Sequence, residues 1–213
     1  MKKHLELTEI QRDALKEIAS IGISHSATAL SKMINKKVMI DVPKVNILSI
    51  NKLADVLTTS NELIVGIYFK VLGKVSGKVL LSFKKESALV LADILMKKSV
   101  GETKILAEME QSALKELGAI STAVCLNALA EFLGMVLLPS IPHFMYDYSD
   151  SIVKSLFDEV KSDTEYVVVV DSEFKESNNK ILGRFLIFPN EDAFESIWHA
   201  LKINRDRHPI FLM

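Results

Sequence analysis

The chain has 213 residues, of which 49% are hydrophobic and 25% are charged, and its formal net charge is −1. Such a chain suits one globular domain or two small halves that share a core. The near-neutral charge argues against a nucleic-acid partner, because nucleic-acid-binding domains are strongly basic. The single cysteine, Cys125, excludes an internal disulfide and is typical of a reducing compartment.

The chain also lacks the signals of export, membrane insertion and metal binding. Its first residues carry charged side chains instead of the apolar core of a signal peptide. No apolar run approaches the length of a membrane span. The histidines show no metal-ligand spacing, and there is no glycine-rich phosphate loop. We therefore expect a cytoplasmic protein with no cofactor, no metal and no membrane insertion.

Two helices are predicted at the start of the chain. The first covers residues 7–21, and apolar residues at helical spacing form its predicted buried stripe, namely Leu7, Ile10, Ala14, Ile18 and Ile21. A second stripe, made of Asp13, Glu17 and Ser20, lies roughly a quarter turn away at 100° per residue. Gly22 is expected to end this helix, and another is predicted over residues 24–34.

Three strands and a helix complete the predicted first half. Strands are expected at residues 38–50, 62–71 and 74–83, and a helix is expected at residues 86–98. Pro43 makes the first strand an edge or bent strand, because proline cannot donate to a sheet ladder. Leu72-Gly73 is predicted to form the hairpin turn. Residues 99–103 are the expected boundary between the halves.

The second half is predicted to repeat this order. Helices are expected at 105–119 and 122–133, an extended segment at Pro139 and Pro142, strands at 165–174 and 180–188, and a helix at 191–201. Gly134 is the expected C-terminal cap of the helix before it. The segment near 147–160 has no counterpart in the first half and predicts an extra helix.

The repeat is also visible residue by residue. A shift of 99 positions aligns residues 9–43 with 108–142, with 9 identities in 35 positions. The chain is therefore interpreted as a single domain over 1–213, built from repeats at about 7–99 and 105–203. The order of elements predicts an α+β fold, a pseudo-two-fold duplicated unit with a largely antiparallel sheet covered by helices.

Each repeat carries one spaced motif. The first copy reads Asp13-x3-Glu17-x2-Ser20-x22-Pro43, and the second reads Ser112-x3-Glu116-x2-Ala119-x22-Pro142. This pattern resembles the signature (D/S)-x3-E-x2-N-x22-P of the CheC/CheX/FliY chemotaxis phosphatases, which CheC carries twice. The resemblance to CheC covers nearly the whole chain. The asparagine is the one element of the signature that both copies lack.

The resemblance implies a protein that binds a phosphorylated CheY-type response regulator and hydrolyses its aspartyl phosphate. In the family, the glutamate reaches a lysine of the regulator and the asparagine orients the attacking water. Glu17 and Glu116 are then motif and partner-binding positions, and Asp13 and Ser112 also contact the partner.

Ser20 and Ala119 stand where the family has asparagine. The Ser20 hydroxyl ends about one bond short of an asparagine amide, and a misplacement on the order of 1 Å can lower a rate about 100-fold. Ala119 carries no polar side-chain atom. We expect weak or lost phosphatase activity, so whether the protein is an enzyme stays open. An ordinary polar role for Ser20 is an equal alternative.

Two other functions follow from the same resemblance. CheC relatives bind the receptor deamidase CheD, which implies a non-catalytic adaptor. FliY and the FliM middle domain resemble this fold, which implies a structural role in the flagellar switch. A nucleophilic triad of Ser24, His25 and Asp13 is disfavoured, because nothing in the sequence brings these side chains together.

Overall fold

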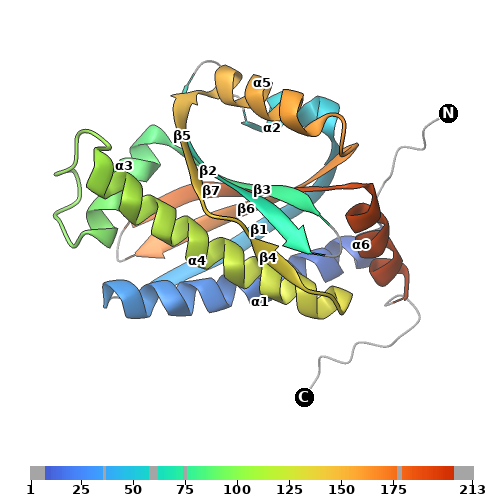
Figure 1. The fold of residues 1–213 in the computed structure, drawn as a ribbon. Helices are drawn as coiled ribbons and strands as arrows, with labels where there is room; N and C mark the ends of the chain where they lie inside the picture. The colour runs from blue at the N-terminus through green and yellow to red at the C-terminus, as the bar shows by residue number, and fades with distance from the viewer. Residues whose placement is uncertain (1–7, 36, 58–61, 74–75, 177–178, 204–213) are drawn as a thin grey trace.

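A curled antiparallel sheet with helices on both faces forms the fold (Figure 1). The computed structural model describes residues 8–35, 37–57, 62–73, 76–176 and 179–203. The helices are α1 (Glu9–Ile34), η1 (Ile50–Lys52), α2 (Leu53–Leu57), α3 (Lys85–Leu95), α4 (Glu108–Leu133), α5 (Ser149–Val160) and α6 (Glu191–Ile203). The strands are β1 (Val38–Ser49), β2 (Leu63–Gly73), β3 (Gly77–Lys84), β4 (Leu137–Pro139), β5 (His143–Tyr148), β6 (Tyr166–Glu176) and β7 (Asn179–Pro189).

The strand order of the sheet is symmetric about its centre. The order is β1-β6-β7-β3-β2-β4, β5 also pairs with β2, and every pairing is antiparallel. By their place in the chain, β6 and β7 of the second half correspond to β2 and β3 of the first, and β4 with β5 corresponds to β1. The strands therefore succeed one another from either edge to the centre in the same order. This arrangement confirms the predicted α+β fold with a largely antiparallel sheet covered by helices.

The strand registers follow the same symmetry. In the β1–β6 pair, Lys44 lies opposite Asp171. β6 follows β2 by 103 positions, as Tyr166 follows Leu63, whereas β5 follows the end of β1 by 99. The pair that corresponds to Lys44 and Asp171 is therefore His143 and Tyr68, and these two residues lie opposite each other in the β5–β2 pair. The β1 register slips between Asp41 and Lys44, and the corresponding break separates β4 from β5. The slips occur at the positions of the two motif prolines.

The two sheet faces bury separate cores. Alternate residues of β2 point to opposite faces, so Val65, Ile67 and Phe69 join the cluster under α1, α3, α4 and α6. Ile64 and Tyr68 join the cluster under α2 and α5. Figure 1 shows the sheet lying between the α1–α4 pair and the α2–α5 pair. The motif helices therefore lie together in one outer layer, which α3 and α6 complete.

The predicted helix breaks in both halves are wrong. α1 and α4 each run through 26 residues without interruption. Gly22 is buried inside α1, where a Cβ atom would lie only 3.0 Å from the Cα atom of Cys125 on α4. Gly22 therefore lets α1 and α4 approach each other closely. A glycine inside a helix costs only about 1 kcal/mol relative to alanine, so it does not have to end the helix. The predicted cap at Gly134 is confirmed by its left-handed φ of 64°.

Two details of the predicted strands and helices also need correction. Leu72 and Gly73 belong to β2 and pair with β4, so they do not form the predicted hairpin turn. The segment near 147–160 forms α5, but the short helix α2 occupies the same place in the first half, between the edge strand and the hairpin. The sequence pattern of five-residue α2 is too short to reveal a helix.

Candidate functional site

The two motif helices pack side by side and run in opposite directions. The Ser26 hydroxyl lies 3.5 Å from the backbone oxygen of Ser121, and Gly22 lies against Cys125. In both pairs the residue numbers add up to 147, so the contact moves backward along α4 as it moves forward along α1. The two helices are therefore antiparallel. The helices therefore cross near Ser24 on α1, and the motif segments lie on opposite sides of this crossing.

The α1 stripe, made of Asp13, Glu17 and Ser20, lies at the surface. Asp13 and Glu17 are exposed and Ser20 is half-buried. The three residues are spaced four and three positions apart, so their side chains share one helix face. Ser20 precedes Gly22 by two residues and is turned roughly 160° from the contact with α4. The stripe therefore faces away from the neighbouring helix.

The α4 stripe, made of Ser112, Glu116 and Ala119, has the same geometry. Ser112 and Glu116 are exposed, and Ala119 is half-buried. Glu17 and Glu116 each lie seven residues from the helix crossing, so the two carboxylates are about 20 Å apart along the helix axes. The structure thus brings each triplet together but keeps the triplets apart, as two sites instead of one.

Buried polar contacts fix the start of α4, and the sequence reasoning missed them. The Asp93 carboxylate is fully buried and accepts hydrogen bonds from the backbone amides of Gly101, at 2.7 Å, and Thr103, at 2.9 Å. Burial alone would raise the pKa of this carboxyl, but the hydrogen bonds from Thr103 and Gly101 outweigh it and hold the pKa below its usual value. Lys98 Nζ donates to Glu110 Oε1 on α4 at 2.8 Å.

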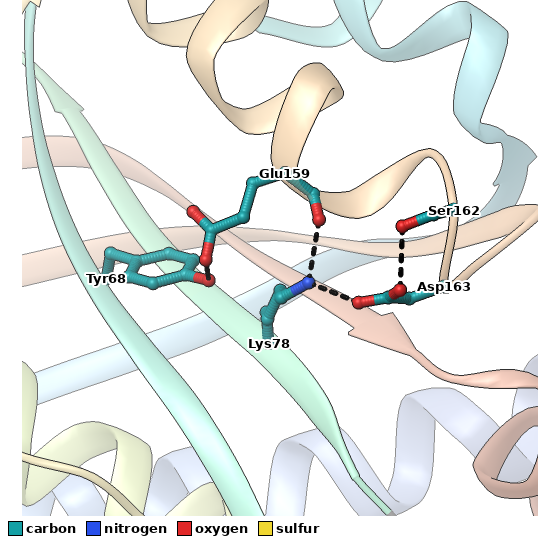
Figure 2. Close-up of polar contacts among 5 residues, drawn as sticks. All are labelled: Tyr68, Lys78, Glu159, Ser162 and Asp163. Carbon is teal, nitrogen blue, oxygen red and sulfur yellow. Dashed lines mark hydrogen bonds and ion pairs between the residues drawn. The ribbon is translucent and has the colours of Figure 1, made fainter.

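The helix α5 is held on the sheet by a second polar cluster (Figure 2). The Tyr68 hydroxyl donates to Glu159 Oε1 at 2.7 Å. Lys78 Nζ donates to the Glu159 backbone oxygen at 2.9 Å and to Asp163 Oδ2 at 2.6 Å. Burial, followed by the Glu159 hydrogen bond, raises the pKa of Tyr68 above its usual value. These charged residues carry no motif spacing, so sequence reasoning had no signal for their contact.

Other candidate chemistry finds little support in the geometry. Among the residues that the structure describes, no three His, Cys, Asp or Glu side chains gather to hold a metal ion. Asp13 lies 11 residues before Ser24, about 16 Å along α1, so these residues cannot form a triad with His25. Burial raises the pKa of the Cys125 thiol to about 12, which leaves it protonated at neutral pH.

One observation on α4 bears on membrane insertion. Of the helices described, α4 alone is long and apolar enough to cross a membrane. The sequence prediction had found no run of this kind, because charged residues are scattered along it. In the structure, Leu114, Leu117 and Leu126 of α4 are buried in the core of the fold. Packing in the core therefore accounts for part of the apolar character of α4, since 33% of its most apolar window is buried.

Comparison with known proteins finds relatives among chemotaxis and flagellar proteins. The model of the CheC-like family matches residues 10–47, which contain the α1 stripe. The CheY-P phosphatase CheC of Bacillus subtilis strain 168 is 29% identical over 199 residues, covering 92% of this chain and 95% of that protein. The flagellar motor switch phosphatase FliY of the same strain is 34% identical over 112 residues, covering 52% of this chain and 29% of that protein.

Solved structures show the same fold. The crystal structure of Thermotoga maritima FliY superposes with a TM-score of 0.75 at 23% identity, covering 93% of this chain and 99% of that chain. The FliM middle domain from H. pylori superposes with a TM-score of 0.64 at 13% identity, covering 91% and 99% of the two chains. Together with the sequence matches, this likeness makes the chain a homologue of CheC and FliY that has the FliY fold.

Proposed function

We propose that this protein binds the phosphorylated form of a CheY-type response regulator through the α1 and α4 stripes. One observation carries the proposal: Glu17 and Glu116 are exposed at corresponding positions of two helices with the same geometry. The relative CheC is named as a CheY-P phosphatase. A carboxylate on each stripe would pair with a lysine of the regulator, and Asp13 and Ser112 would lie beside that contact.

The residues of the stripes make hydrolysis slow or absent. Aspartyl-phosphate hydrolysis needs a water molecule held in line with the phosphorus, so catalysis depends on positioning and electrostatics. The Ser20 hydroxyl would hold this water about one bond too far away, at a cost of about 100-fold in rate if the displacement is on the order of 1 Å. Ala119 cannot hold it. The α1 stripe is therefore a catalytic site with a lower rate than one that carries asparagine, and the α4 stripe is a docking site without catalysis.

Binding is tested by titrating the protein with the CheY-type regulator of the same organism, loaded with beryllium fluoride as a phosphate mimic. We expect two regulators per chain. Glu17→Gln should abolish one binding event, and Glu116→Gln should abolish the other. Glu131→Gln is the matched control, because Glu131 is exposed on α4 outside the stripe. Unchanged binding by the Glu17→Gln, Glu116→Gln double variant would disprove the proposal.

Catalysis is tested by following the loss of phosphate from the same regulator. Ser20→Asn and Ala119→Asn should each accelerate hydrolysis, by about 100-fold for the α1 stripe, because each restores a water-holding amide. Ser20→Ala should remove the remaining activity of the natural chain. Fast hydrolysis by the Ser20→Ala variant would show that another group positions the water.

The replacement of both asparagines also favours a second candidate, a non-catalytic adaptor that binds CheD. A chain without amides could hold its partners without destroying the phosphate signal. Co-purification with CheD, combined with no effect on regulator phosphate, would select this function over weak phosphatase activity. Failure to bind CheD would remove it.

A further inference from the structure

Ile10 lies at the protein surface although its spacing predicted a buried side chain. It is 60% exposed, whereas Leu15 on the same helix is 6% exposed. The corresponding residue of α4, 99 positions later, is Met109, which is 70% exposed while Leu114 is fully buried. Both motif helices therefore present a large apolar side chain to solvent at the same position.

This position is aligned with the motif carboxylates. Ile10 precedes Glu17 by seven residues, which is two helical turns, so the two side chains lie within about 20° of one line and about 10 Å apart along the axis. Met109 stands in the same relation to Glu116. Ile10 is also three residues before Asp13, which places it directly beside the stripe. Each stripe is thus extended at its N-terminal end by one exposed apolar residue.

We propose that Ile10 and Met109 are apolar anchors that seat the receiver domain of the regulator on the two stripes. This inference rests on the proposed function. Interfaces take most of their binding energy from a few large side chains, while neighbouring charges contribute orientation and association rate. Two residues of different type, both apolar and both exposed beside a motif carboxylate, fit this division of roles.

The anchor role has a signature that a charged contact lacks. Burying an apolar side chain stabilises a complex with little dependence on salt, whereas an exposed carboxylate–lysine pair weakens as salt is added. Substituting the anchor should therefore lower affinity equally at low and high salt. Substituting Glu17 should lower affinity mainly at low salt and flatten the salt dependence.

The test uses the full chain and the beryllium-fluoride-loaded regulator at two salt concentrations. To isolate one stripe, Ile10→Ala is made together with Glu116→Lys, and Met109→Ala is made together with Glu17→Lys. Each anchor substitution should weaken the remaining binding event about tenfold, and Ile10→Leu should restore it. Met33→Ala is the control, because Met33 is exposed on α1 but lies roughly 140° around the helix from Ile10.

The outcomes separate this inference from the proposed function. If the natural chain does not bind the loaded regulator, the proposed function fails and the anchors fail with it. If binding depends on the glutamates but the anchor variants lose less than twofold, only the anchor inference is overturned. A loss that Met33→Ala reproduces, or that flattens the salt dependence, also overturns it.

Discussion

Replacing Gly118 by alanine tests how α4 is seated on the sheet. Gly118 is buried, one residue before Ala119 of the α4 stripe. A Cβ atom at this position would lie 2.8 Å from Ile67 Cγ2, 3.0 Å from its Cδ1 and 3.2 Å from its Cβ. Ile67 is fully buried in β2. Because its Cβ is among the crowded atoms, a change of rotamer alone cannot relieve the contact.

The sign of the effect follows from two opposing contributions. Alanine is favoured over glycine in a helix by about 1 kcal/mol. Overpacking of a closely packed core costs about 1–3 kcal/mol. The net range is about 0–2 kcal/mol, and we expect Gly118→Ala to lower the free energy of unfolding by an amount near its upper end, since the contact involves three atoms of a fixed side chain. For a chain of this size, each kcal/mol corresponds to roughly 2–4 °C in Tm.

The corresponding pair of residues toward the other edge of the sheet supplies the rescue. The positions that correspond to Gly118 and Ile67 by the shifts of 99 and 103 hold Ala19 and Val170. The double variant Gly118→Ala, Ile67→Val recreates this pair and should recover most of the lost stability. Thermal unfolding of the natural chain, both single variants and the double variant forms a complete cycle. A higher Tm for Gly118→Ala, or no recovery in the double variant, would refute the reasoning.

Three further predictions concern the contacts around the site. Asp93→Asn should lower stability by about 2 kcal/mol at neutral pH, because charge-assisted hydrogen bonds are lost. Since the folded pKa of Asp93 is lowered, this difference should stay constant above about pH 4 and shrink as the pH falls, as urea titrations would measure. Tyr68→Phe should cost about 1 kcal/mol by removing its bond to Glu159, and an unchanged Tm would contradict that role. Cys125 is half-buried and the pKa of its thiol is raised to about 12, so it should react slowly with thiol reagents at pH 8 until the chain unfolds. Rapid labelling of the folded protein would contradict this raised pKa.

The repeat made much of the fold predictable. The shift of 99 positions identified paired helices, and the α+β arrangement with hairpins followed from the alternating strands. The helix breaks were predicted wrongly because glycine is read as a breaker, whereas Gly22 permits contact with Cys125 on the neighbouring helix. That contact joins residues about 100 positions apart, and local sequence carries no trace of it.

The candidate site was predictable only in part. Glu17 and Glu116 were found through their spacing, and both are exposed. Ile10 was assigned to the buried face because its spacing from Ala14 and Ile21 matches a helix period. The true buried face is centred elsewhere, on residues such as Leu15 and Ile23 that are buried in the core cluster. An apolar residue on a helix can thus lie on either face, and the tertiary packing decides which.

The symmetric strand order of the sheet has a consequence for truncated forms of the protein. The edge strand β1 pairs with β6, and β2 pairs with β4 and β5, so each half lends its outer strand to the other half. A fragment cut in the linker before α4 would keep only its own hairpin and lose the neighbour of every remaining strand edge. Such a fragment should be stable only by exchanging strands with a second copy, in the manner of a domain-swapped dimer.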